Sequence, residues 1–294
     1  MGILEGKTVA VTGGGRGIGR GHGLHLADAG ARVVVNDLDL EQAEKVVAEI
    51  RAQGGAAVAD GCDVSTREGA RALVAHCVEE FGQIDGLVSN AGIVRDRSFL
   101  KMTDEEFDAV IRVHLRGTFL GCQEAALRMR EQGRGGALVN TTSAAHFGNF
   151  GQANYSAAKG GIASMTYTLA LELARFGIRV NAISPSGSTR MTENLKMPDG
   201  SPLPYVDPAQ NGPVVVFLCS DEADYVTGQV FGTGSGRLNL LSHPKYQEGE
   251  VREGGLSLDD VRKIFQEKFR NHLEPIGIMN RPYPFYDGIK PAAK

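Results

Sequence analysis

Short runs of apolar, β-branched residues alternate with longer segments of helical periodicity from the first residues onward. This alternation is typical of repeated β-α-β units that build a parallel sheet. The pattern predicts seven strands, at residues 8–11, 31–36, 56–60, 86–89, 137–142, 179–183 and 229–231. The segments between them predict helices at residues 17–29, 40–53, 67–81, 104–131, 152–176 and 208–220. Because each helix is long enough to cross over the sheet, we expect a doubly wound α/β fold of the Rossmann type with a seven-stranded parallel sheet.

The alternation stops after Gly236. Residues 237–294 contain one segment of helical periodicity, at 258–270, and a tail at 281–286 that is rich in proline and aromatic residues. About 58 residues with one helix make a poor independent core. We therefore expect one domain at residues 1–236 and a C-terminal extension at 237–294, docked on the same domain or on a neighbouring subunit. Large aromatic side chains suit either a cover over a substrate pocket or a subunit contact.

The charge balance narrows the class of partner. Lys and Arg number 31 against 35 Asp and Glu, a net charge of −4, whereas nucleic-acid-binding proteins carry a basic surface. The apolar runs are far shorter than the roughly 20 residues that span a bilayer, and no secretion signal is visible at the N-terminus. The four cysteines form no C-x-x-C pair and no histidines stand at zinc spacing, so no metal is expected. We expect a cytoplasmic protein with a small-molecule substrate, and neither nucleic acid nor a membrane as partner.

A glycine-rich segment follows the first predicted strand and leads directly into the first predicted helix. Its sequence, Thr12 to Gly19, has the spacing G-x-x-x-G-x-G. Glycines in a strand-loop-helix unit allow a tight turn and a close approach of the backbone to a pyrophosphate, and the helix N-terminus supplies N–H groups and a positive dipole. A nucleotide is therefore expected to bind at Gly13, Arg16, Gly17, Ile18 and Gly19.

An acidic residue ends the second predicted strand. Asp37 stands about 18 residues after the last glycine of the loop, near the spacing at which an acid hydrogen-bonds the adenosine ribose of a dinucleotide. Its charge would repel a 2′-phosphate, and Leu38 after it offers no cation to neutralise one. These residues predict NAD rather than NADP as the cofactor. Two further strand ends fit the same crevice, with contacts to adenine expected from Asp63 and Val64 and a closing loop from Asn90, Ala91 and Gly92.

Two polar residues at helical spacing predict the reaction chemistry. Tyr155 and Lys159 are four residues apart near the start of a predicted helix, so both side chains share one face. An ammonium near a phenol stabilises the phenolate, which then acts as a base closer to neutral pH. Ser143 follows the preceding predicted strand, where it can hold a reacting oxygen by a hydrogen bond.

Taken together and in this chain order, these motifs resemble the short-chain dehydrogenase/reductase family over residues 4–236, which include Asn181-Ala182-Ile183-Ser184-Pro185. The resemblance implies that Tyr155 removes the proton from a substrate alcohol while hydride passes to the nicotinamide. It implies that Ser143 orients the substrate oxygen, and that Lys159 lowers the pKa of Tyr155 and binds the nicotinamide ribose, so that Tyr155 and Lys159 also contact the cofactor. It further implies a homotetramer or homodimer, formed through the helices around residues 107–130 and 154–176.

The chain departs from the family pattern at two places. His114 stands where family members usually carry an Asn that belongs to a proton relay; a neutral His can also donate and accept, so His114 is either a catalytic relay or a structural residue. After Pro185 the family often has Gly and then a Thr that contacts the nicotinamide amide. Here Ser186 replaces the Gly, and the expected cofactor contacts in this segment are Pro185, Ser188, and either Thr189 or Thr192.

Residues 112–119, 148–155 and 190–192 resemble the dehydrogenase unit of peroxisomal multifunctional enzymes of type 2 and their bacterial relatives. That resemblance implies NAD-dependent oxidation of a 3-hydroxyacyl-CoA, with steroid side-chain acyl groups as one substrate class. A hydroxysteroid or other secondary-alcohol dehydrogenase without CoA is the alternative. A 3-oxoacyl-carrier-protein reductase is disfavoured because such enzymes usually use NADPH, which Asp37 opposes. A non-catalytic nucleotide-binding subunit is disfavoured because Ser143, Tyr155 and Lys159 are all present.

Overall fold

The computed structural model describes residues 2–189 and 204–278. Contacts between residues divide the chain into two units, of which one ends at Leu241 and the other begins at Ser242. The predicted contact residue Thr192 and the aromatic tail at 281–286 lie outside the described residues. The first unit contains the sheet and every other predicted site residue.

Eight strands of the described chain form one sheet in the order β3-β2-β1-β4-β5-β6-β7-β8. Their bounds are β1 Thr8–Thr12, β2 Arg32–Asn36, β3 Ala56–Asp60, β4 Gly86–Ser89, β5 Gly136–Thr141, β6 Ile178–Pro185, β7 Val230–Gly234 and β8 Arg237–Leu240. All neighbouring strands from β3 to β7 pair in parallel. This arrangement confirms the predicted α/β fold of the Rossmann type.

The prediction of seven parallel strands was wrong by one strand, because β8 pairs antiparallel with β7. The two strands are joined by Ser235 and Gly236, which both have positive φ, +55° and +69°. Positive φ at both central residues is what a two-residue type I′ hairpin requires, and its twist matches that of the flanking strands. The segment Gly234-Ser235-Gly236 therefore marks a hairpin within the sheet rather than the end of it.

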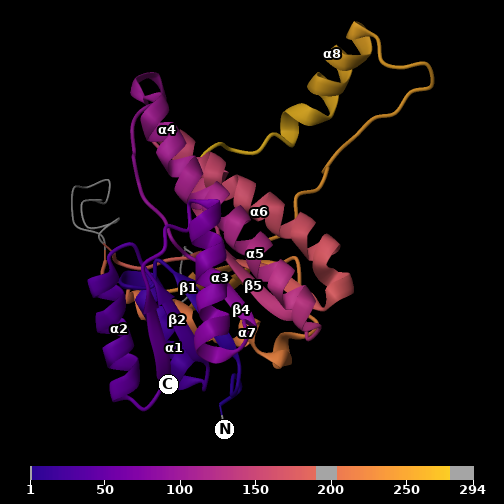
Figure 1. Cartoon of the computed structure of the whole chain (residues 1–294). Coiled ribbons are helices and arrows are strands. Elements are labelled where there is room, and N and C mark those ends of the chain that lie inside the picture. The colour runs from indigo at the N-terminus through magenta and orange to yellow at the C-terminus, as the bar shows by residue number, and fades with distance from the viewer. Residues whose placement is uncertain (1, 190–203, 279–294) are drawn as a thin grey trace, which may run out of the picture. The chain divides into compact units, whose positions relative to one another are not determined.

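Helices cover both faces of the sheet (Figure 1). The helices of the first unit are α1 Gly17–Asp28, α2 Leu40–Ala52, α3 Arg67–Phe81, α4 Asp104–Ile111, α5 Gly117–Gln132, α6 Ala153–Leu173 and α7 Gly212–Cys219, whereas α8 Leu258–Glu267 belongs to the second unit. Residues of α1, α2 and α7 pack in one buried cluster and residues of α3, α5 and α6 in another. The single helix predicted at 104–131 is instead α4 and α5 joined by one turn of π-helix, Arg112–Arg116.

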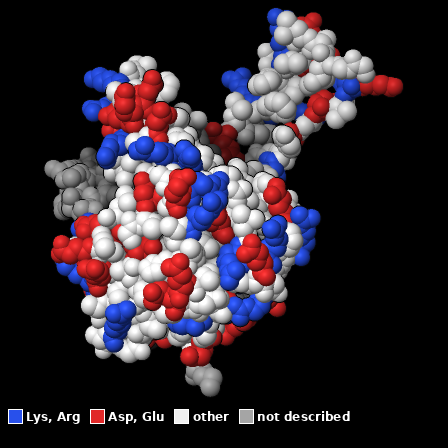
Figure 2. Space-filling model, viewed as in Figure 1, with Lys and Arg blue, Asp and Glu red and all other residues white. Residues whose placement is uncertain are grey.

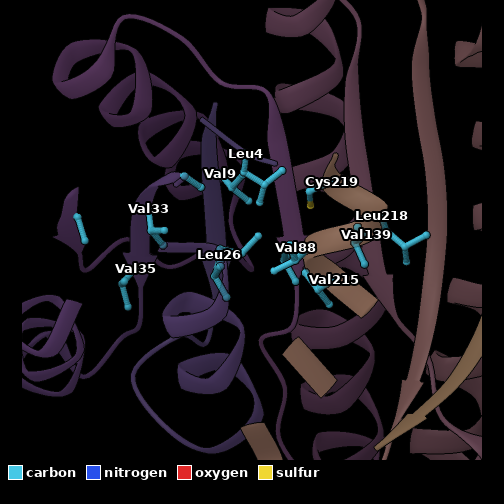
Figure 3. Packing of buried hydrophobic residues seen from close by; sticks show 14 of the residues in the cluster. Leu4, Val9, Leu26, Val33, Val35, Val88, Val139, Val215, Leu218 and Cys219 are labelled. Carbon is cyan, nitrogen blue, oxygen red and sulfur yellow. The ribbon is translucent and has the colours of Figure 1, made fainter. Parts of the chain in front are cut away.

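The two buried clusters share strands whose side chains alternate between the faces. Val9 and Val11 of β1 belong to the cluster with α1, α2 and α7, shown in Figure 3, whereas Ala10 between them faces α3 and α5. All three side chains are fully buried. A strand covered on both faces reads as a continuous apolar run, which explains why the strands were recognisable in the sequence.

The surface mixes charges of both signs on the face shown in Figure 2. Among the described residues, no helix is long and apolar enough to cross a membrane. No cluster of three or more His, Cys, Asp or Glu side chains in the described parts of the chain could hold a metal ion. All four cysteines are unpaired thiols.

The second unit is built around α8. Ser257 begins this helix with a capping box, in which its side chain accepts the Asp260 N–H and the Asp260 carboxylate accepts the Ser257 N–H. Phe265 and Phe269 pack edge to face, with ring centroids 5.3 Å apart. The predicted start of this helix after Ser257 agrees with the structure. The predicted docking of the extension stays a prediction.

The first helix contains a fully buried histidine. His22 of α1 is fully buried, and neither ring nitrogen has a hydrogen-bond partner among the described residues. Burial lowers the pKa of His22 to about 3. Because the folded-state pKa lies below the unfolded value, the unfolded chain binds more protons between pH 6.5 and 3, so stability falls as the pH falls through this window.

We therefore expect the His22→Leu variant to lose less stability on acidification than the wild type does. The difference in the free energy of unfolding should reach on the order of 2–3 kcal/mol by pH 4. Urea unfolding at pH 7 and pH 4, followed by circular dichroism, measures it. The matched control is His272→Leu, which alters an exposed histidine; equal acid sensitivity in His22→Leu and the control would contradict the prediction.

Candidate active site

The candidate site lies at the carboxyl ends of the parallel strands. The chain leaves β1 toward β2 and β3 on one side, and the later strands begin with β4 on the other side of β1. In an open α/β sheet, ligands bind in the crevice at such a reversal of strand order. The predicted site residues come from the strand ends and loops at β1 to β6, from the first turns of α6 and, for His114, from the π-helical turn between α4 and α5.

Two glycines of the loop after β1 have no room for a side chain. Gly13 has φ +61°, and a Cβ added there would lie 2.9 Å from Ala91 Cα. A Cβ on Gly19 would lie 2.1 Å from the Gly13 carbonyl oxygen. Arg16 is the N-cap of α1 and Ile18 lies in its first turn, where backbone N–H groups lack intrahelical partners. The loop thus fits a pyrophosphate held at a helix N-terminus.

The hydroxyl of Thr12 joins the loop to the end of β4. Thr12 Oγ1 accepts the backbone N–H groups of Asn90 and Ala91, both at 3.0 Å. The Asn90 side chain in turn donates to the carbonyl oxygens of Thr12 and Gly13 at 3.0 and 3.1 Å. Thr12 and Asn90 therefore fix the loop against the end of β4. Thr12 was not predicted as a site residue, although its place directly before Gly13 was the available signal.

The carboxylate of Asp37 is fixed beside the same loop. Its Oδ2 accepts the Gly15 N–H and its Oδ1 accepts the Asp39 N–H, both at 3.0 Å. Leu38 between them is 70% exposed. These bonds place Asp37 at the carboxyl end of β2, where it can accept hydrogen bonds from a ribose diol.

Asp63 and Val64 follow β3 in a local turn. The Asp63 carboxylate accepts the Ser65 N–H at 2.9 Å, and Val64 is buried. The turn places both residues at the carboxyl end of the strand next to β2, so their predicted contact with adenine remains compatible with the structure and stays a prediction.

Lys159 is buried beside the carboxyl end of β5. Its Nζ donates to the Thr141 carbonyl oxygen at 2.6 Å and lies 5.5 Å from the centroid of the Tyr155 ring. Burial lowers the pKa of Lys159 to about 7. The Thr142 hydroxyl donates to the Lys159 carbonyl oxygen at 2.7 Å and so fixes this turn of α6 against β5. The lysine is thereby placed next to the tyrosine with its proton weakly held.

Tyr155 and Ser143 meet at the start of α6. Burial raises the pKa of the Tyr155 phenol above its ordinary value, and a side-chain hydrogen bond with Ser143 opposes that shift. Ser143 is the N-cap of a 3₁₀ turn, Ala144–Phe147, where its Oγ accepts the Ala145 N–H at 3.2 Å. The serine hydroxyl is therefore oriented toward the tyrosine by its own backbone turn.

A buried asparagine fixes the first turn of α6. The side chain of Asn154 donates to the carbonyl oxygens of Arg95 and Glu106 at 2.9 and 3.0 Å. Its Oδ1 accepts the Tyr155 N–H at 2.7 Å. Asn154 thus positions the tyrosine, a role that sequence reasoning missed because one polar residue beside a helix start carries no spacing signal.

His114 lies against the ring of Tyr155. The two ring centroids are 5.2 Å apart with an interplanar angle of 89°. His114 belongs to the π-helical turn Arg112–Arg116, and such bulges recur at functional sites. Its Nε2 lies 2.7 Å from the Ile93 carbonyl oxygen and 3.0 Å from the Ile93 nitrogen, so it bonds the same residue in either neutral tautomer.

Burial lowers the pKa of His114 to about 3, so the ring is neutral at physiological pH. Its Nδ1 is buried without a hydrogen-bond partner among the described residues. A Cβ on Gly92 would lie 2.2 Å from His114 Cε1, so the Asn90-Ala91-Gly92 loop packs directly on this ring. The structure thus brings His114 to the tyrosine; its part in a proton relay stays a prediction.

Of the contacts predicted at and after the end of β6, Thr189 lies close to the glycine loop. Pro185 ends β6, and a Cβ on Gly17 would lie 3.1 Å from the Thr189 side chain. Ser188 is paired with Val206, whose N–H its hydroxyl accepts at 2.9 Å. The structure therefore brings Thr189 to the nucleotide loop, whereas Thr192 lies outside the described residues.

A family profile described as enoyl-(acyl carrier protein) reductase matches residues 13–236. The chain belongs to the short-chain dehydrogenase/reductase family. Members of this family use a nicotinamide nucleotide, and the cradle of Gly13 and Gly19 and the carboxylate of Asp37 fit such a group.

Named relatives of this short-chain dehydrogenase/reductase differ in their reported roles. The chain is 41% identical to the peroxisomal multifunctional enzyme type 2 of Mus musculus over 81% of its own length, but spans only 33% of that protein. It is 40% identical to the 3-oxoacyl-[acyl-carrier-protein] reductase of Thermotoga maritima, over 79% of this chain and 98% of that one. A crystal structure of a short chain dehydrogenase from Mycobacterium avium matches with a TM-score of 0.84 at 40% identity, covering 94% of this chain and 98% of that chain.

The contact between Ser143 and Tyr155 predicts a pH effect. In Ser143→Ala the hydrogen bond that lowers the Tyr155 pKa is lost, so the phenolate forms only at higher pH. We expect the rise of alcohol-oxidation kcat/KM with pH to move to higher pH, and the maximal rate to fall about 10²-fold or more with the lost hydrogen bond to the reacting oxygen. The matched control is Ser143→Thr, which keeps the hydroxyl; an unshifted profile in Ser143→Ala would contradict the assignment.

Proposed function

We propose that this protein is an NAD-dependent dehydrogenase that oxidises a 3-hydroxyacyl-CoA to the 3-oxoacyl-CoA. The observation that carries the proposal is the grouping of Ser143, Tyr155 and Lys159 at the carboxyl end of β5, beside the nucleotide loop. The likeness to the mouse multifunctional enzyme and to a carrier-protein reductase supports acyl thioesters as the substrate class. Steroid side-chain acyl groups are included in that class.

In this mechanism the substrate hydroxyl binds between Ser143 and Tyr155. A bound nicotinamide supplies the hydride acceptor. The Tyr155 phenolate takes the hydroxyl proton as the C–H bond of the carbinol carbon breaks, so that the alcohol loses one hydride and one proton and becomes a ketone. Ser143 holds the oxygen by a hydrogen bond throughout. Lys159 supplies positive charge near the phenolate, and the neutral ring of His114 packs edge to face against the tyrosine ring.

The preference for NAD is supported by Asp37. Its carboxylate is held by two backbone N–H groups and remains able to accept bonds from the ribose hydroxyls. A 2′-phosphate would bring negative charge against it at close range. The same repulsion argues against an NADPH-dependent carrier-protein reductase, despite the relative of that name.

The second candidate is a hydroxysteroid or other secondary-alcohol dehydrogenase that acts without CoA. Phe99, Leu100 and Phe150 are 76%, 94% and 91% exposed. The N–H of Arg97, near Phe99 and Leu100, donates to the carbonyl oxygen of Gly151, which lies between Phe150 and Tyr155 in the sequence. Exposed apolar side chains such as these could contact the ring system of a steroid as well as an acyl chain.

We further propose a cytoplasmic homotetramer or homodimer that associates through α4, α5 and α6. Exposed apolar side chains on these helices support such contacts, since large exposed apolar residues mark interaction surfaces. They are Phe107, Phe119, Leu127 and Leu171.

The substrate assignment predicts turnover confined to thioesters. We expect initial-rate reduction of NAD, and at least tenfold less of NADP, with (3R)- or (3S)-hydroxyacyl-CoA thioesters including steroid side-chain examples. Free hydroxysteroids should give no turnover, and Tyr155→Phe should abolish it by removing the base. Turnover of free sterols alone would instead establish the second candidate, and a rate unchanged in Tyr155→Phe would overturn the mechanism.

The extension is predicted to contribute to subunit packing. A chain that ends at Leu241 keeps β8 and the whole first unit, so we expect it to fold. Its subunit number, measured by size-exclusion chromatography with light scattering, should fall relative to the full chain. An unchanged assembly with a widened substrate range would show instead that the extension covers the substrate pocket.

A further inference from the structure

Arg16 lies in the loop whose backbone bonds the carboxylate of Asp37. Gly15, directly before Arg16, donates its N–H to Asp37 Oδ2 at 3.0 Å. The Asp39 N–H donates to the other carboxylate oxygen of Asp37 at 3.0 Å. Arg16 and Asp39 therefore flank Asp37 from two different loops, and their side chains meet in an ion pair with 2.6 Å between Arg16 Nη2 and Asp39 Oδ2.

The Asp39 side chain makes this ion pair and does not cap the helix that follows it. It is the N-cap residue of α2, where an aspartate side chain usually accepts a backbone N–H of the first turn. The Asp39 carboxylate makes no such cap bond. The Gln42 N–H bonds the Asp39 backbone carbonyl instead, at 3.0 Å. The carboxylate is thus committed to Arg16 rather than to its own helix.

The position of Arg16 gives this ion pair a consequence for nucleotide choice. A ribose whose hydroxyls bond Asp37 has its 2′-oxygen close to the loop that carries Arg16. A guanidinium presents a planar fork of donors that matches a phosphate group, and it is the side chain that proteins use to bind a 2′-phosphate. A free Arg16 would therefore favour a 2′-phosphorylated adenosine and oppose the repulsion from Asp37.

We propose that Asp39 is a second determinant of nucleotide specificity, which excludes 2′-phosphorylated adenosine by holding the guanidinium of Arg16. Asp37 repels a 2′-phosphate directly, and Asp39 withholds the cation that would offset the repulsion. The inference rests on the proposed binding of the cofactor ribose at Asp37. It adds that replacing Asp37 alone leaves Arg16 paired, so the specificity of this site depends on two carboxylates.

The effect of Asp39 is expected to be modest, because both partners of the ion pair are partly exposed. The Arg16 and Asp39 side chains are 38% and 42% exposed, and ion pairs at such sites are weak and screened by salt. We therefore expect the ion pair to change the affinity for a 2′-phosphate by no more than about tenfold. The salt dependence supplies a second signature, since the advantage of freeing Arg16 should shrink as salt screens its attraction to phosphate.

The test uses the full chain and calorimetric binding of two adenosine fragments, 5′-AMP and 2′,5′-ADP. We expect Asp39→Asn to raise the affinity for 2′,5′-ADP about three- to tenfold at low salt, and to leave the affinity for 5′-AMP within about twofold. The gain should vanish in the double variant with Arg16→Gln, because Asp39 acts through Arg16. Asparagine is also a favoured N-cap residue, so α2 should remain intact.

The matched control is Glu41→Gln. It removes one negative charge from the first turn of α2, at a residue that pairs with Lys45 instead of Arg16. It should leave the ratio of the two affinities unchanged. An equal gain in Glu41→Gln, or a gain in Asp39→Asn that persists without Arg16, would overturn the role of Asp39. Failure of the wild type to bind 5′-AMP would overturn the proposed cofactor site itself, and the two failures are thereby distinguished.

Discussion

The parallel pairing of β1 with both β2 and β4 is the constraint on which the rest of this structure depends. The strands β2 and β3 lie on one side of β1, and β4 and the later strands lie on the other. The loop after β1 is therefore bordered by Asp37, which follows β2, and by Asn90, which follows β4. Neither residue is near the glycine loop in sequence. Each bonds the loop backbone directly, so the shape of the nucleotide cradle is set by the register of the sheet. A shift of one residue in either strand pair would reverse the facing of its side chains and break these bonds.

Burial is the largest cause of the pKa shifts of Tyr155, Lys159 and His114. It weakens the hold of Lys159 on its proton, raises the pKa of Tyr155 and keeps His114 neutral. Specific contacts act against this common effect, as the Ser143 hydroxyl does at the tyrosine. The proposed mechanism thus asks the Tyr155 phenol to ionise where ionisation is costly, and the hydrogen bond with Ser143 is the contact that opposes this cost. In that mechanism, Tyr155 depends on Ser143 and Lys159 to act as a base.

Much of this arrangement could be predicted from the sequence because its signals are local or periodic. Buried parallel strands read as apolar runs, and the i, i+4 spacing put Tyr155 and Lys159 on one face of α6. The contributions of Thr12 and Asn154 arise from contacts between segments far apart in the chain, which no single segment encodes. β8 was missed because four residues leave little periodicity, and the hairpin glycine read as the end of the domain. The ion pair of Arg16 with Asp39 likewise depends on the meeting of two loops.

The π-helical turn between α4 and α5 determines which helix position faces Tyr155, and it does so independently of which side chain stands at that position. One extra residue in a helical turn rotates everything after it by about 100° relative to a regular α-helix. The ring of His114 reaches Tyr155 from within that turn. The insertion therefore selects which position along the helix is presented to the tyrosine, and the side chain found there can vary without moving the backbone. A substitution at position 114 would change the group that faces the Tyr155 phenol and leave the bulge in place, whereas loss of the bulge would turn a different face of the helix toward the tyrosine.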